Sequence, residues 1–543
     1  MRFAVVTVIT LGMLFRFPAP ASDIQTQKVD QIFSVYDKPG SPGCSVGVIR
    51  DSDFLYRKAY GLASLELGVP LSAQSVFYMG SVSKQFTAAS VVLAAEQGYL
   101  SLDDDVRKYI SELPDYGHVI TLRQMIHQTS GFRDFITLLH LSGRDVLDFN
   151  SPEDIFKIVG RQRGLNNVPG DEWIYSNTNY FLLGMVVQRA TKKSLAEFAA
   201  ENIFKPLGMS HTLFYDDHTL VVPGRVAAYD SGQHDAFHVD WSTTFAVVGS
   251  GGLMSTVDDL LLWDRNFYAN RLGKGTLIQE LQTPGVLNNG NKINYAMGLD
   301  LGHYRGLPIV EHSGALFGYR TELLRFPEQK FTVICLCNIA TAVPTNLARK
   351  VADVYLADQL QPGASALSPA RNEDFPDPAT FAGKYLDPRT HLMYTFTASN
   401  GNLMAWGAVL IRINANQFYD LGSNVITFES SKGTTQAKLD IKGETYFSGS
   451  RVPELRLGEA VLASYTGQFP SAELDAVYSL SIESGILTLR NRDDPPQKLT
   501  PIAKDEFDAG EFGRLVFERD SGGVFGFRVF TQDARGIAFK KIK

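Results

Sequence analysis

The chain has 543 residues, of which 44% are apolar and 20% charged, a composition typical of a globular protein and not of a disordered one. The formal net charge of -7 is mildly acidic and spread along the chain, which argues against a nucleic-acid partner or a polybasic membrane anchor. This length exceeds one ordinary hydrophobic core, so we expect two or three domains.

Residues 1–21 have the pattern of a secretory signal. A basic start, Met1-Arg2, precedes a mostly apolar stretch from Phe3 to Phe15, and the segment ends in Pro18-Ala19-Pro20-Ala21. This order predicts a cleaved signal peptide and a mature protein that begins at Ser22. An uncleaved anchor is the alternative. The later chain contains no apolar run long enough to span a bilayer, so we expect an exported protein, periplasmic or secreted.

The next segment begins with a predicted β-hairpin. Two apolar-rich runs, Cys44 to Arg50 and Phe54 to Ala59, flank a short polar turn. Two further cysteines, Cys335 and Cys337, lie two apart in a strand-like run and therefore face the same side. Buried thiols are the usual interpretation of such residues. A bridge from Cys44 to one of them is the alternative in an oxidising compartment, and the sequence leaves the choice open.

Four residues, Ser81-Val82-Ser83-Lys84, open a predicted helix that Gly98 is placed to end. A serine at a helix N-terminus faces unpaired backbone N–H groups, and Lys84 lies one turn further along on the same face. A desolvated lysine in this place can be neutral and can take the serine proton. Taken alone, the pattern is more often an N-cap serine followed by a surface lysine.

The remainder of this segment is predicted to be helical at first and to form strands later. Helix starts are indicated at Thr121, near Tyr180, at Ser194 and at Thr256. Two strand-like runs, Ile309 to Phe326 and Phe331 to Asn338, then precede a closing helix from Leu347 to Leu360. Helices in the middle and strands at both ends predict an α+β domain over residues 22–360, with one mainly antiparallel sheet covered by helices.

Residues 361–380 are rich in Pro, Ala, Ser and Asp and are predicted to be a linker. The chain beyond them is wholly strand-like. Hairpin turns are predicted at Asn400-Gly401, Lys442-Gly443, Ser484-Gly485 and Ser521-Gly522-Gly523. The segment Phe381 to Tyr385 matches Tyr465 to Phe469, with the two glycines 84 residues apart (467-383=84). We therefore expect two small antiparallel β-barrel domains, residues 381–458 and 459–543, which either pack against the first domain or shape its active site.

Two further clusters in the first domain carry reactive groups. Tyr175-Ser176-Asn177 precedes a predicted helix; an ionised tyrosine beside an ammonium can act as a base, and an amide two residues later can orient a substrate carbonyl. A core tyrosine with a satisfied hydroxyl is the alternative. His312-Ser313-Gly314 lies at the start of a predicted strand. The small Ser313 and Gly314 after the histidine let a substrate lie along the edge of that strand. The N–H of Ala315 can then join that of Ser81 in holding an oxyanion.

In this order and spacing, Ser81-Val82-Ser83-Lys84, Tyr175-Ser176-Asn177 and His312-Ser313-Gly314 resemble the three motifs of the serine hydrolases related to class C β-lactamases and penicillin-binding proteins. The resemblance covers roughly residues 30 to 355. The D-aminopeptidases of this group are similar in having two barrels after the catalytic domain. Their sequences are also similar to this chain at Gly131-Phe132-Arg133-Asp134-Phe135 and at Asp533-Ala534-Arg535-Gly536.

We therefore predict hydrolysis through a covalent ester on Ser81. Lys84 with Tyr175 moves the proton, and His312 supplies a hydrogen bond or partial charge near Tyr175. Substrate is bound by Asn177, Gly314 and Ala315. No metal or cofactor is needed. His234 and His238 are four apart, but their polar segment predicts a loop and not a metal site.

The resemblance implies release of an amino-terminal D-residue from small peptides, amides or esters, with a loop of the last barrel closing the pocket. The corresponding segment here, Arg490 to Gln497, is short and contains two prolines, which departs from the family pattern. Asp493, Asp494 and Asp300 are candidates for meeting a substrate ammonium, although each is also typical of a solvated turn carboxylate.

Two other functions fit the same motifs. One is a carboxylesterase or weak β-lactamase of the same family. β-Lactamases of this group usually carry a lysine in place of His312, which argues against efficient antibiotic hydrolysis. The other, of a different class, is a protein that binds cell-wall peptides or a partner without turnover.

Overall fold

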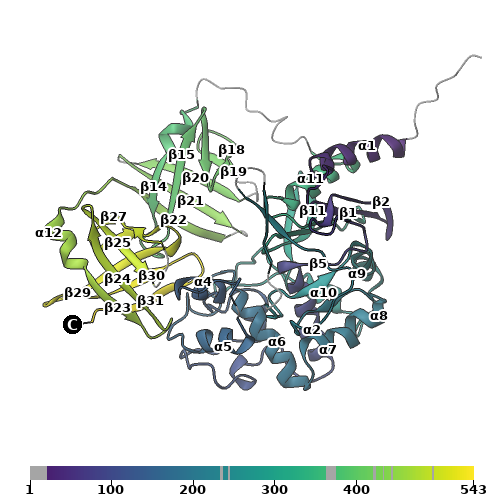
Figure 1. The fold of residues 1–543 in the computed structure, drawn as a ribbon, viewed down its shortest axis with the longest axis horizontal. Coiled ribbons are helices and arrows are strands. Elements are labelled where there is room, and N and C mark those ends of the chain that lie inside the picture. The colour runs from purple at the N-terminus through teal and green to yellow at the C-terminus, as the bar shows by residue number, and fades with distance from the viewer. Residues whose placement is uncertain are drawn as a thin grey trace, which may run out of the picture.

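The computed structural model describes residues 21–148, 150–232, 236–241, 245–361, 375–419, 424–431, 433–441, 444–491 and 495–542. An α/β region up to residue 361 is followed by a first β region, residues 375–452, and a second β region, residues 459–542 (Figure 1). Several predictions fall outside the described residues: the signal up to residue 20, most of the linker, His234, the turn Lys442-Gly443, Asp493 and Asp494.

A six-stranded antiparallel sheet, in the order β10-β11-β12-β13-β1-β2, forms the centre of the α/β region. Its strands are β1 (Cys44–Arg50), β2 (Asp53–Tyr60), β10 (Asp300–Tyr304), β11 (Leu307–Leu316), β12 (Tyr319–Phe326) and β13 (Phe331–Cys337). Because β1 pairs with β13, strands from the two ends of the region share one sheet. The predicted α+β fold with a mainly antiparallel sheet is confirmed.

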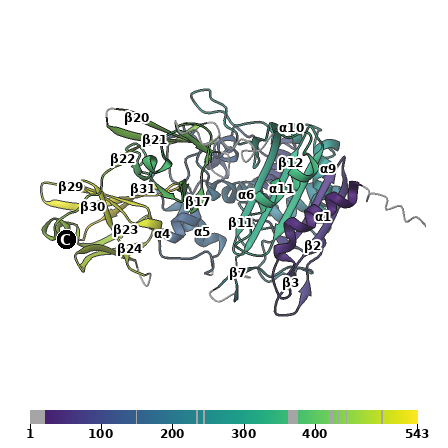
Figure 2. The same ribbon diagram turned by 90° about the horizontal axis from the view of Figure 1, so that it is seen from above.

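Side-chain alternation along the strands divides the helices between the two faces of this sheet. Val46 and Val48 of β1 pack in one core with α1 (Ala21–Phe33) and α11 (Pro344–Tyr355), which lie along the same face in Figure 2. On the opposite face a Cβ at Gly47 would lie 2.7 Å from a methyl carbon of Val257, the first residue of α9. Glycine thus allows α9 to pack closely against the sheet.

The helical part includes α2 (Lys84–Glu96), α3 (Leu122–Ile126), α4 (Phe135–Leu141), α5 (Pro152–Gly160), α6 (Asn177–Thr191), α7 (Leu195–Ala199), α8 (Lys205–Leu207), α9 (Val257–Ala269) and α10 (Leu277–Leu281). Thr121, Ser194 and Thr256 cap helices as predicted. The helix expected to start near Tyr180 is present and begins three residues earlier, at Asn177. The closing helix begins earlier than predicted because Pro344 presets its first turn. Within the described residues, no helix combines the length and apolar character needed to cross a membrane.

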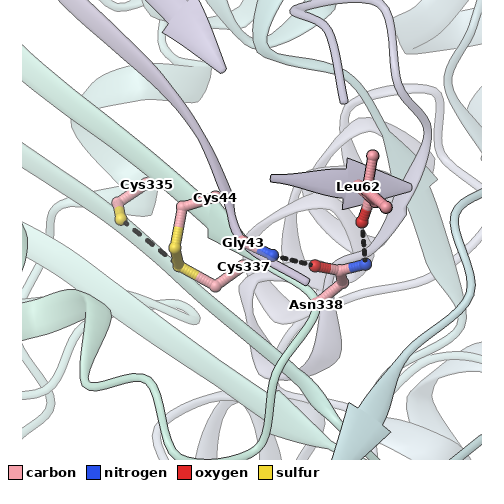
Figure 3. The surroundings of a disulfide bond; sticks show 6 residues. All are labelled: Gly43, Cys44, Leu62, Cys335, Cys337 and Asn338. Carbon is pink, nitrogen blue, oxygen red and sulfur yellow. Dashed lines mark hydrogen bonds between the residues drawn. A yellow bond between two sulfur atoms is a disulfide. The ribbon is translucent and has the colours of Figure 1, made fainter. Parts of the chain in front are cut away.

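A disulfide settles the cysteine question that the sequence left open. Cys44 and Cys337 are direct partners in the β1–β13 register, and their sulfurs are bonded (Figure 3). Cys335 is buried as a thiol, with its Sγ 3.8 Å from that of Cys337. Asn338 adds a second tie between the same strands, because its side-chain oxygen accepts a 2.8 Å hydrogen bond from the N–H of Gly43.

The first β region is a nine-stranded antiparallel sheet in the order β17-β16-β15-β14-β22-β21-β20-β19-β18. Its strands are β14 (Gly383–Leu386), β15 (Met393–Ser399), β16 (Asn402–Ala405), β17 (Ala408–Val409), β18 (Ile411–Arg412), β19 (Gln417–Tyr419), β20 (Val425–Ser431), β21 (Thr434–Ile441) and β22 (Glu444–Val452). Its two edge strands, β17 and β18, are consecutive in the chain. The sheet therefore curls into a nearly closed barrel around an aromatic core.

The second β region is antiparallel throughout and divides its strands between two sheets. One contains β23 (Gly467–Ser471), β24 (Ala476–Glu483), β25 (Ile486–Asn491) and β26 (Gln497–Lys498). The other contains β27 (Thr500–Ala503), β28 (Glu506–Asp508), β29 (Arg514–Asp520), β30 (Gly523–Phe530) and β31 (Arg535–Lys540). The sequence repeat is visible in the backbone: Gly383 and Gly467 begin equivalent strands with φ of 149° and 143°, values that favour glycine.

Candidate active site

Ser81 lies in a 3-10 turn, Gly80–Ser83, that leads directly into α2. Backbone approaches the turn so closely that two glycines are required. A Cβ at Gly80, whose φ is 53°, would lie 2.7 Å from the backbone nitrogen of Ala315, and one at Gly314 would lie 3.0 Å from that of Ser81. The N–H groups of Ser81 and Ala315 therefore belong to the same crossing of the turn and β11, as an oxyanion site requires.

Lys84 makes three polar contacts in a fully buried position. Its Nζ lies 2.9 Å from Ser81 Oγ, 2.9 Å from Asn177 Oδ1 and 2.8 Å from the carbonyl oxygen of Ser250. Burial lowers the pKa of Lys84 to about 7, against the charge of Asp134, which raises it. A neutral amine has two N–H groups and one lone pair. With both N–H groups donated to Asn177 and Ser250, the lone pair faces the Ser81 hydroxyl.

Tyr175 approaches Ser81 from the other side and donates a 2.8 Å hydrogen bond to Oγ. Burial raises the pKa of Tyr175 above its ordinary value, and the charges of Asp134 and Asp300 raise it further. The neutral phenol is thus a proton donor, not the ionised base that the sequence allowed. The main reason is burial, which disfavours the charged phenolate. The Nζ of Lys84 lies 4.7 Å from the centroid of this ring.

Asn177 is the first residue of α6, and its backbone N–H donates a hydrogen bond to the carboxylate of Asp134. The same carboxylate accepts hydrogen bonds from the N–H groups of Ile136 and Thr137 at 2.9 and 3.2 Å and so caps α4. One side chain therefore serves two helix N-termini. The sequence analysis named Asp134 within a motif but did not predict this capping role, although an aspartate two and three residues ahead of helical N–H groups is a capping signal.

His312 is buried on β11 beside Tyr175, with the two ring centroids 6.4 Å apart. Its Nδ1 donates to the carbonyl oxygen of Ser313 at 2.7 Å, which leaves Nε2 toward the hydroxyl of Tyr295 at 3.4 Å. The structure thus brings His312 to the group that contains Tyr175. The sequence did not identify Tyr295, because its part in the group depends on the packing of a distant loop.

Asp300 begins β10 close to the start of α2. Two residues earlier, Gly298 has a φ of 73°, and a Cβ there would lie 2.6 Å from the backbone carbonyl carbon of Lys84. The charge of Asp300 is near enough to raise the pKa of both Tyr175 and Tyr180, after the larger effect of burial. The structure therefore places Asp300 at the edge of the reactive cluster.

Both β regions contact the segment that leads to Tyr175. Glu172 forms ion pairs with Arg389 of the first β region and with Arg535 of the second, the latter at 3.1 Å. A cavity of about 740 Å³ lies where α4 meets the two β regions, with Thr137 and Asp533 in its wall. Both β regions thus lie against the α/β region close to the site.

Neither of two groups of potential metal ligands, the three cysteines and the pair His234 and His238, forms a metal site in the described residues. The sulfurs of Cys44, Cys335 and Cys337 lie within 4.8 Å of one another, but the disulfide uses two of them. His238 lies exposed in the short strand β8 (Phe237–Val239), and not in the predicted loop, because β8 pairs with β7 (Tyr229–Ser231).

Comparison with known proteins agrees with this geometry. The Beta-lactamase family model matches residues 29–357. The D-aminopeptidase of Gluconobacter oxydans (strain 621H) is 26% identical over 531 residues, which cover 93% of this chain and 96% of that protein. Penicillin-binding protein 4* of Bacillus subtilis (strain 168) is 30% identical over 303 residues, which cover 53% of this chain and 66% of that protein.

Among solved structures, the octameric penicillin-binding protein homologue from Pyrococcus abyssi superposes with a TM-score of 0.56 at 19% identity, over 87% of this chain and 98% of that one. This likeness concerns the fold alone. The family model, by contrast, matches well over half of the chain, and it coincides with the region that contains Ser81, Lys84 and Tyr175. The chain belongs to the Beta-lactamase family and is a serine hydrolase.

Proposed function

We propose that this protein is an exported, D-aminopeptidase-like hydrolase that cleaves amide or ester bonds of small peptides through an acyl-enzyme. The observation that carries the proposal is the environment of Ser81, whose Oγ lies 2.9 Å from the buried Nζ of Lys84 and 2.8 Å from the hydroxyl of Tyr175. The substrate class is supported by the D-aminopeptidase of Gluconobacter oxydans, which this chain matches over 96% of that protein's length.

Acylation begins when Ser81 Oγ attacks the substrate carbonyl and its proton passes to the lone pair of Lys84. The N–H groups of Ser81 and Ala315 hold the developing oxyanion. The carbon–nitrogen or carbon–oxygen bond then breaks, and the leaving group takes the proton of Tyr175, which Lys84 replaces. In the second half water attacks the ester and gives its proton to Lys84, while Ser81 Oγ recovers a proton from Tyr175. Lys84 then returns its proton to Tyr175, which restores the starting state.

The remaining residues bind and orient. Asn177 holds Lys84 and faces the acyl group, and Gly314 leaves room for the substrate along β11. His312 supports Tyr175 through ring contact and by its hydrogen bond to Tyr295. Asp300 is the candidate partner of a substrate ammonium, because it is the acidic side chain whose charge reaches Tyr175 from the start of β10.

Export belongs to the proposal. It is supported by the signal-like residues 1–21 and by the disulfide between Cys44 and Cys337, since such bonds persist mainly in oxidising compartments. We also propose domain limits of 22–360, 381–458 and 459–543, with residues 361–380 as the linker. Sequencing the amino terminus of the secreted or periplasmic protein tests the predicted start at Ser22.

The deciding experiment compares initial rates on matched D- and L-alanine p-nitroanilides, a short-chain p-nitrophenyl ester and a chromogenic cephalosporin. We expect a strong preference for the D-amide that is lost in Ser81→Ala. Cleavage of the ester without the amides indicates an esterase, and cleavage of the cephalosporin alone indicates a β-lactamase. Rates equal to those of Ser81→Ala on every substrate contradict the proposal and favour a binding protein.

A further inference from the structure

An unbroken path of hydrogen bonds connects the second β region to the nucleophile. The carbonyl oxygen of Asp533 accepts the backbone N–H of Asp134 at 2.9 Å, and the carboxylate of Asp134 accepts that of Asn177. Asn177 Oδ1 in turn lies 2.9 Å from Lys84 Nζ, which lies 2.9 Å from Ser81 Oγ. Four contacts therefore connect Asp533, in the loop between β30 and β31, to the reacting oxygen.

The first residue of this path lies in a braced hairpin. Asp533 belongs to the loop between β30 and β31, in which the hydroxyl of Thr531 accepts the N–H of Ala534 at 2.9 Å. The loop also contacts the α/β region with its side chains: the hydroxyl of Thr137 in α4 donates to the Asp533 carboxyl at 2.8 Å. In Figure 1, α4 lies at the border with the two β regions.

Side chains of the α/β region and of the second β region also hold the same hairpin. The side chain of Asn166 donates to the carbonyl oxygen of Asp533 at 2.9 Å and accepts the N–H of Arg535 at 2.8 Å. Arg133, next to Asp134, forms a buried 2.7 Å ion pair with Glu473, which also accepts an N–H of β31. The hairpin is thus held at its loop and along β31.

Asp134 connects the hairpin to the active site, because its N–H is bound by Asp533 and its carboxylate binds Asn177. Its buried carboxylate takes the first N–H of α6, where Ser176 provides no side-chain cap. A shift of Asp134 therefore moves the start of α6 and with it Asn177. Since Asn177 directs one N–H of Lys84, the direction of the lysine lone pair changes as well. Misplacement of reacting groups by about 1 Å can cost a reaction about 100-fold.

We propose that the β30–β31 hairpin and Asp134 together form a positioning element that aims Lys84 at Ser81. Asp134 and Asp533 are positioning residues, since neither touches Ser81. The inference rests on the proposed function for the roles of Ser81 and Lys84. It gives the second β region a part in catalysis, beyond packing against the first region.

The first test shortens the hairpin in the full-length protein. Phe530 and Arg535 are register partners, so replacing Thr531–Ala534 with Asn-Gly closes the hairpin by a two-residue turn. The change removes Asp533 and with it the contacts of the loop with Asp134 and Thr137. We expect kcat on the best substrate to fall about 10- to 100-fold with KM little changed. The control is Arg161→Gln, which removes an exposed ion pair with Asp475 between the same two regions and should leave kcat unchanged.

The second test, Asp134→Asn, keeps the shape and an acceptor oxygen but removes a charge. Because that charge raises the pKa of Lys84, its loss should shift the acid limb of the rate profile to lower pH. The same charge adds to the pKa of Tyr175, but burial has the larger effect there and keeps the phenol neutral in the variant. It also raises the pKa of the Asp533 carboxyl, after the larger effect of burial, so that pKa should fall in the variant. The ring of Tyr180 stays over Lys84. A purely structural role predicts a lower yield of folded protein with the wild-type pH profile.

A fluorophosphonate probe of Ser81 separates the two proposals. If wild type cleaves no substrate of the panel, the proposed function fails, yet the rate of probe labelling against pH still reports on Lys84. Slower labelling in the shortened-hairpin variant supports the positioning element. Wild-type labelling rates and pH profiles in both variants overturn it, and if the hairpin variant does not fold, Asp134→Asn alone decides.

Discussion

Cys44 and Cys337 lie directly opposite each other at the ends of the adjacent strands β1 and β13, and a disulfide joins them. The bond closes a loop with a sequence separation of 293 residues, so it restricts the unfolded chain strongly. The remaining thiol, Cys335, is a poor nucleophile for exchange, because burial raises its pKa above the ordinary value.

Removing this bridge by Cys44→Ala should lower the free energy of unfolding by about 2–5 kcal/mol. Activity at low temperature should persist, since neither sulfur touches the reactive cluster. Peptide mapping without reductant should recover the Cys44–Cys337 pair, and denaturant titration measures the loss. The matched variant Cys335→Ala keeps the bridge and should cost less. Equal stability of Cys44→Ala and wild type would contradict the prediction.

The pH dependence of acylation should report the ionisation of Lys84. Burial lowers the pKa of Lys84 to about 7, and only the neutral amine can accept the proton of Ser81. The rate should therefore rise with pH and reach half of its plateau near pH 7. Tyr175 should add no loss at moderately alkaline pH, because its pKa is raised. Measuring kcat/KM from pH 5 to 9 tests this, and a rate that falls as pH rises through 7 would assign catalysis to the ammonium form.

Tyr175→Phe should remove the proton donor to Ser81 while keeping the ring beside Lys84. Loss of one general acid typically costs about 100-fold or more in rate, so we expect kcat to fall by that factor with KM little changed. Tyr180→Phe is the control. Its hydroxyl donates to the carbonyl oxygen of Ile126 at 2.7 Å, although its ring also faces Lys84. Similar losses in both variants would show that the effect is not specific to the Tyr175 hydroxyl and would contradict its part as the proton donor.

Gly314→Ala should separate β11 from the Ser81 turn. The added Cβ would lie 2.1 Å from the carbonyl oxygen of Met79 and 2.4 Å from the hydroxyl oxygen of Thr321, so the backbone must move. The oxyanion contacts then lengthen, and removing one such donor costs about 100-fold or more in kcat. Gly302→Ala on β10 is the control, because its Cβ would meet Ile309 at an ordinary 3.6 Å. A wild-type kcat for Gly314→Ala would contradict the proposal that the close approach of β11 to the Ser81 turn forms the oxyanion site.

Local signals in the sequence were sufficient for much of the fold. The capping box at Thr121 and the hairpin of β1 and β2 depend on neighbouring residues, and both are present. The repeat that placed two antiparallel β regions is equally local, since Gly383 and Gly467 need the same unusual backbone. The capping box and the hairpin are decided by neighbouring residues, and the repeat by the likeness of two short segments, which is why a single sequence shows them.

The features that sequence reasoning missed depend on distant partners. The start of α6 is set by Asp134, which lies 43 residues earlier and caps the helix from another element. The partner of Cys44 follows from a register in which Cys335 faces Val46 instead. The protonation of Tyr175 is decided by burial, which a motif does not encode. The proposed roles of the site residues therefore need the folded molecule as well as the motifs.

Glu473→Gln should weaken the attachment of the second β region. Glu473 pairs with Arg133 at 2.7 Å, and both side chains are more than nine-tenths buried. Removing one partner of a buried pair leaves the other charge uncompensated, at a cost of about 3–5 kcal/mol. The variant should therefore lose the interface between these regions at lower denaturant concentration than wild type, as followed by limited proteolysis and urea titration.

The pH dependence of this contact has a definite sign. Burial raises the pKa of Glu473, but Arg133 and two backbone N–H groups lower it more, so the folded value lies below the ordinary one. Stability from this carboxylate is then present above the unfolded pKa and is lost as pH falls through the folded value. The difference between wild type and Glu473→Gln should shrink in acid. Asp475→Asn, at the exposed ion pair with Arg161, should change little at either pH. A Glu473→Gln deficit that is equally large in strong acid would show that the lost charge is not its cause.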